Sequence, residues 1–101
     1  MIHLQIVSRD GQNLQSLIRS AINEGSIKSF AIARVKGGLV IKHKKHLGEI
    51  ALENTSGPLL ATLKCKNRAK EWQLLEAFVG RLAYHFKNEV SAVNIQFESE
   101  D

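Results

Sequence analysis

The chain has 101 residues, a net charge of +4 at pH 7 and a hydrophobic fraction of 44%. These values exclude a disordered chain and leave room for one globular domain over residues 1–101, with residues 98–101 as a short acidic tail. Cys65 is the single cysteine, which excludes an intramolecular disulfide and fits a reducing compartment. We expect a cytoplasmic protein without membrane contacts, because the alternating N-terminus is unlike a signal peptide and no run approaches roughly 18 apolar residues.

A strand and a helix are predicted at the start of the chain. Residues 2–6 alternate apolar and polar side chains, which is typical of a strand. Apolar residues then recur over 14–22 at the spacing of one helical face. Asp10 is the expected N-cap of this helix, and Gly25 stands where a left-handed residue would end it.

Four β-rich runs follow in the middle of the chain. They cover residues 27–35, 39–45, 49–53 and 59–66. Gly37-Gly38 favours a hairpin turn between the first two runs, because glycine adopts positive φ angles readily. A further turn is expected at residues 56–58, before the last run. Cys65 falls on the apolar side of that run and is expected to be a small buried side chain.

A second helix is predicted after Asn67, its expected cap, and a last strand at 93–97. The apolar stripe of this helix comprises Ala69, Trp72, Leu75, Val79, Leu82, Ala83 and Phe86, broadened by Leu74 and Phe78. The order β-α-β-β-β-β-α-β, with one apolar side per element, predicts an α+β two-layer sandwich. We expect a mainly antiparallel sheet with both helices on one face; a ferredoxin-like topology with an extra hairpin is one arrangement of this order.

Basic residues are concentrated in the middle of the sequence. Lys28–Lys70 contains ten basic and two acidic residues, a net charge of +8 against −4 for the rest. Such segregation favours steering toward a polyanion. The candidate anion-binding residues are Lys42, Lys44, Lys45, Lys64, Lys66, Arg68 and Lys70. Four of them are expected on the open face of the sheet: Lys42 and Lys44 in one strand, and Lys64 and Lys66 in another.

Arg68 and Lys70 are expected at the start of the second helix, where free N–H groups and the helix dipole favour an anion. The plain alternative is that the lysines only keep one sheet face hydrated.

Nucleic-acid backbone is the expected partner, since lysines placed this way suit phosphate contacts. The aromatic residues Phe30, Trp72, Phe78, Phe86 and Phe97 fit core positions, which leaves Tyr84 outside. Without exposed rings to stack bases, duplex or structured RNA is favoured over a single strand. The alternative is a protein-interaction or dimerisation module. Its basic face would contact an acidic protein, and the chain could also form a homodimer.

Catalytic and metal-binding motifs are absent from the sequence. His43 and His46 would face opposite sides of a strand, and the lysines beside them repel a cation. We therefore expect no metal and no cofactor, while both histidines would add positive charge below neutral pH. The sequence thus predicts a non-enzymatic binding domain.

Overall fold

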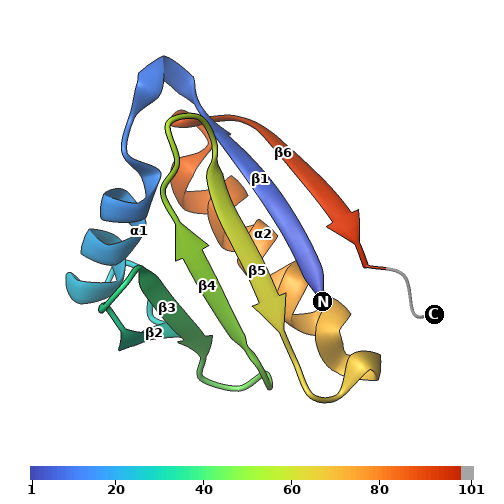
Figure 1. Cartoon of the computed structure of the whole chain (residues 1–101). Helices are drawn as coiled ribbons and strands as arrows, with labels where there is room; N and C mark the ends of the chain where they lie inside the picture. Colours follow the sequence, from blue (N-terminus) through green and yellow to red (C-terminus); the bar gives the residue numbers. More distant parts are fainter. Residues whose placement is uncertain (99–101) are drawn as a thin grey trace.

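The structure is a computed structural model that describes residues 1–98 (Figure 1). Its elements are β1 (Ile2–Ser8), η1 (Arg9–Gly11), α1 (Leu14–Asn23), β2 (Phe30–Arg34), β3 (Leu39–His43), β4 (Glu49–Glu53), β5 (Leu59–Lys64), η2 (Arg68–Lys70), α2 (Glu71–Phe86) and β6 (Val90–Phe97). Six strands form one antiparallel sheet, and both helices lie on the same face of it. The predicted α+β class and element order are confirmed. Beyond residue 98, the predicted acidic tail lies outside the described residues.

The strand order is β2-β3-β4-β5-β1-β6. β1 lies between β5 and β6, the two strands that α2 connects, which is the split β-α-β arrangement of ferredoxin-like sheets. β3 and β4 extend this sheet and separate β5 from β2, the strand that follows α1. Consequently α1 contacts β2, whereas α2 contacts β5 and β6 (Figure 1).

The core lies between the sheet and the helices. It is built from alternate strand residues and from one side of each helix, and it comprises Ile2, Leu4, Ile6, Leu14, Ile18, Ile27, Phe30, Leu39, Ile41, Ile50, Leu52, Leu59, Ala61, Leu63, Leu74, Phe78, Leu82 and Phe86. Burying each large side chain of this set contributes roughly 1.5–3 kcal/mol. Within residues 1–98, no helix is both long and apolar enough to cross a membrane.

The helix caps and the hairpin differ in detail from the sequence prediction. Asn13, and not Asp10, caps α1: its side-chain oxygen accepts the N–H of Ser16 at 3.2 Å. Asp10 lies earlier, in η1, with φ +60°. The hairpin turn spans residues 35–38, because β2 ends at Arg34 after a register shift. Gly25 and the glycine pair do adopt the expected positive φ angles.

The inward side of α2 is rotated relative to the predicted stripe. Leu74, Phe78, Leu82 and Phe86 are buried at regular four-residue spacing. Trp72, predicted to face the core, is 55% exposed. Phe97 is 68% exposed; it is the last residue of β6, an edge strand of the sheet. The prediction that both rings are buried was therefore wrong, and two large aromatic side chains become available at the surface.

Candidate anion-binding groove

Two loops reach the same end of the sheet and enclose a groove. One loop, residues 44–48, joins β3 to β4, and the other, residues 65–70, joins β5 to α2 (Figure 1). The groove between them has a volume of about 1350 Å³. Six of the seven predicted site residues line it, namely Lys42, Lys44, Lys45, Lys64, Lys66 and Arg68. The seventh, Lys70, is exposed in η2 but is not among the described lining residues.

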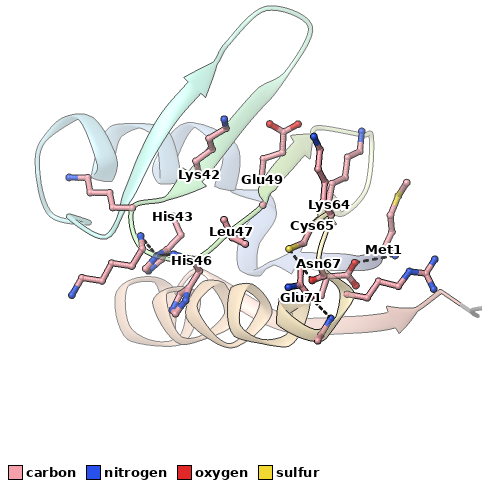
Figure 2. A pocket seen from close by; sticks show the side chains of 16 residues that line it. Met1, Lys42, His43, His46, Leu47, Glu49, Lys64, Cys65, Asn67 and Glu71 are labelled. Carbon is pink, nitrogen blue, oxygen red and sulfur yellow. Dashed lines mark hydrogen bonds and ion pairs between the residues drawn. The ribbon is translucent and has the colours of Figure 1, made fainter.

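The lysines occupy two different settings around this groove. Lys42 and Lys64 stand on the open face of the sheet, on either side of Glu49, which pairs in register with both (Figure 2). Lys44 and Lys66 were expected to continue that row. They lie in the loops instead, because β3 ends at His43 and β5 ends at Lys64. Two of these lysines therefore lie on the sheet face, and the other two lie in the loops at its end.

The β3–β4 loop is held by a histidine. The Nδ1 atom of His43 accepts the backbone N–H groups of Lys45 and His46, each at 3.0 Å (Figure 2). The His43 ring meets Phe30 edge-on at 4.9 Å and lies over His46 at 4.4 Å between ring centroids. The two histidines were expected on opposite sides of a strand; they meet because His46 is in the loop. Within residues 1–98, no cluster of three potential metal ligands is present.

Gly48 also lines the groove, and the sequence analysis did not single it out. It adopts φ +104°, and an added Cβ would lie 2.6 Å from the carbonyl oxygen of Lys64. Only glycine fits both this backbone conformation and this approach to β5. The available signal was a glycine directly before a predicted strand, which marks a bulge or a close approach of two backbones.

Asn67, the expected cap of the second helix, caps the short helix η2 that precedes α2, and not α2 itself. The Asn67 side chain accepts the N–H of Ala69 at 3.0 Å, and the Cys65 thiol donates to the Asn67 carbonyl oxygen at 3.2 Å. α2 itself begins with the acidic Glu71. Lys70 is the N-cap residue of α2 and makes no side-chain cap hydrogen bond, whereas the Glu71 carboxylate already places a negative charge in the first turn. Cys65 is half-buried and lines the groove, so the prediction of a buried core cysteine was wrong.

The groove carries an excess of positive charge. Its lining includes six basic residues and two acids, Glu49 and Glu71. Both acids are ion-paired: Glu49 lies 3.3 Å from Arg34, and Glu71 lies 3.5 Å from the α-amino group of Met1. By contrast, the lysine ammonium groups of the lining form no ion pair within residues 1–98; these are Lys42, Lys44, Lys45, Lys64 and Lys66. Their charge is thus available to an external anion.

His43 gives the loop a pH dependence. Burial, followed by the charges of His46, Lys45 and Arg81, lowers the pKa of His43 below its ordinary value of 6.5. Protonation would also remove the Nδ1 lone pair that holds the loop. Between pH 6.5 and the lowered pKa, His43 is protonated in the unfolded chain but not in the folded chain. The free energy of unfolding therefore falls as the pH falls through this window.

We therefore expect the free energy of unfolding to rise with pH below 6.5 and this contribution to be constant above it. The His43→Asn variant keeps a side-chain acceptor but has no titrating group, so its profile should be flatter. Urea unfolding of both proteins between about pH 5 and pH 8 measures the difference, since the two chains differ only at position 43. Parallel profiles would contradict this role of His43.

Comparisons of the chain with models of protein families, with curated proteins and with solved structures found no match.

Proposed function

We propose that this chain is a non-enzymatic binding domain whose groove holds the phosphate backbone of a nucleic acid. The observation that carries the proposal is the convergence of two loops, distant in sequence, whose lysines form no ion pair with any of the residues that the structure describes. Ammonium groups on flexible stems contact phosphate oxygens without reading bases, so the affinity depends on salt and little on sequence.

Three titratable groups of the groove, two carboxylates and one imidazole, already have partners within the protein, which favours binding over catalysis. Both carboxylates, Glu49 and Glu71, are held in ion pairs. The His43 imidazole holds the loop through its Nδ1 atom. A general acid or base needs a proton position open to the substrate, and these three groups are otherwise engaged.

The proposal is tested by fluorescence anisotropy with labelled single-stranded RNA, duplex RNA and duplex DNA, each at about 50 and 200 mM salt. If each of the five unpaired lysines contacts one phosphate, a plot of the logarithm of the association constant against the logarithm of the salt concentration should have a slope of about −4.5 for duplex DNA. We call this quantity the salt slope. A basic control protein of the same net charge should bind more weakly. Absence of binding at the lower salt concentration would refute the proposal.

A second candidate function, contact with an acidic protein, is favoured by one residue. Leu47 is 57% exposed and lies within the groove among the basic side chains (Figure 2). An apolar side chain surrounded by charge is a common feature of protein interfaces. Tight binding of polyglutamate, together with no binding of nucleic acid, would favour this alternative.

A further inference from the structure

A second depression lies beside the groove, on the outer side of α2. It has a volume of about 740 Å³, and we call it the α2 trough. It is lined by Ser29, His43, His46, Trp72, Gln73, Glu76, Ala77, Gly80, Arg81 and Tyr84. His43 and His46 line both the groove and the trough, so the two surfaces are contiguous. A strand of nucleic acid in the groove therefore has a path onto α2.

Two aromatic rings stand in the trough without burial in the core. Trp72 is 55% exposed and Tyr84 is 74% exposed. The Arg81 guanidinium lies 5.8 Å from the centre of the Tyr84 ring, a distance at which a cation is attracted to the ring face. Trp72 and Tyr84 are separated by roughly 18 Å along the helix axis, from the rise per residue. The trough thus has an exposed aromatic side chain toward each end.

Gly80 lies between these rings at an exposed position inside α2. An added Cβ would meet no atom within 4 Å, so packing of the fold does not require glycine there. Glycine inside a helix costs about 1 kcal/mol relative to alanine. The missing side chain leaves a flat stretch of helix surface, which suits a planar ligand lying across it.

The charges of the trough differ from those of the groove. Glu76 and Arg81 balance one another in its lining, whereas basic residues predominate in the groove. A phosphate is accordingly attracted to the groove and not to the trough. The bases of the same strand suit the trough, because rings stack on them and a carboxylate accepts hydrogen bonds from base amino groups.

We propose that the α2 trough stacks unpaired bases, so that the ligand of the groove is a single-stranded nucleic acid. This inference rests on the proposed function. It also reverses the expectation of a duplex ligand, which depended on Trp72 being buried. A duplex keeps its bases stacked on one another and offers none to Trp72 and Tyr84.

Trp72 is the only tryptophan of the chain, so its fluorescence reports contact with a base directly. We expect quenching when short oligo(U) or oligo(dT) is added, and no quenching with duplex DNA of the same length. The relative response to the two oligonucleotides distinguishes RNA from DNA as the preferred strand. Trp72→Ala should weaken single-strand binding about tenfold, within the range for one stacking platform, and leave the duplex affinity unchanged.

Gly80→Leu provides a second variant that is expected to fold, since leucine is the better helix former. It fills the trough and should weaken single-strand binding in the same way. Phe97→Ala removes an exposed ring on β6, outside the described trough lining, and should have no effect. Salt-sensitive binding without quenching, and with Trp72→Ala unchanged, would overturn the stacking inference while the groove proposal stands. Absence of binding to every nucleic acid would overturn both.

Discussion

Replacement of Lys44, Lys45, Lys64 and Lys66 by alanine is expected to remove most of the affinity for nucleic acid and to reduce the salt slope by about four units. These side chains come from both walls of the groove, and none is ion-paired within residues 1–98. Each phosphate contact releases condensed counterions, so each lost contact lowers the slope by about one unit. Anisotropy titrations over a series of salt concentrations measure both quantities.

A matched control separates the groove from net charge alone. Arg19, Lys28, Lys36 and Lys87 are exposed and are not part of the groove lining. Their fourfold replacement by alanine changes the net charge by the same amount, yet it should leave most of the affinity and nearly the whole slope. All eight positions are exposed, so circular dichroism should show both variants folded. Equal losses in the two variants would mean that charge acts without a defined site.

Gly48→Ala is expected to lower the free energy of unfolding by about 3 kcal/mol or more. Its φ of +104° disfavours an L side chain, and the new Cβ would lie 2.6 Å from the carbonyl oxygen of Lys64. That oxygen belongs to a strand inside the sheet and has little freedom to move. The Leu74 side chain, 3.0 Å away, is fully buried, so the helix side of the site is also filled. Urea denaturation followed by circular dichroism measures the loss.

Two other glycines serve as controls for this substitution. At Gly57 the nearest atom to an added Cβ is the Thr55 hydroxyl oxygen at 3.9 Å, so Gly57→Ala should change stability by less than about 0.5 kcal/mol. At Gly80 the space is open and the backbone is helical, so Gly80→Ala should stabilise the protein by up to about 1 kcal/mol. A Gly48→Ala variant as stable as the wild type would show that the loop can move away from β5.

Several features were predictable because they depend on residues near one another in the chain. Strand alternation in β1, β4 and β5 identified which side chains are buried, since successive side chains of a strand point to opposite faces. The spacing of apolar residues in α1 identified its inward side, since residues three and four positions apart lie on the same face of a helix. The glycines at 25, 37 and 38 indicated turns from their tolerance of positive φ.

The inward side of α2 was less predictable. Apolar residues occupy much of its circumference, from Trp72 and Leu75 to Phe78 and Leu82. Periodicity alone does not decide which of them faces the sheet when the stripe is this wide. The sheet decided it, through the contact of α2 with β5 and β6, and left Trp72 exposed. This one rotation changed the expected ligand from a duplex to a single strand.

The sequence by itself determined the order of the elements, which alternate residues of the central strands are buried, and the segregation of basic residues. These follow from local periodicity and from composition, which need no knowledge of distant contacts. Only the tertiary structure ended β3 at His43 and β5 at Lys64 and brought the following loops together. The groove, the stacked pair of His43 and His46, and the close approach at Gly48 all arise there. Strand ends and loop contacts are decided by what packs against them, and that information is spread over the whole chain.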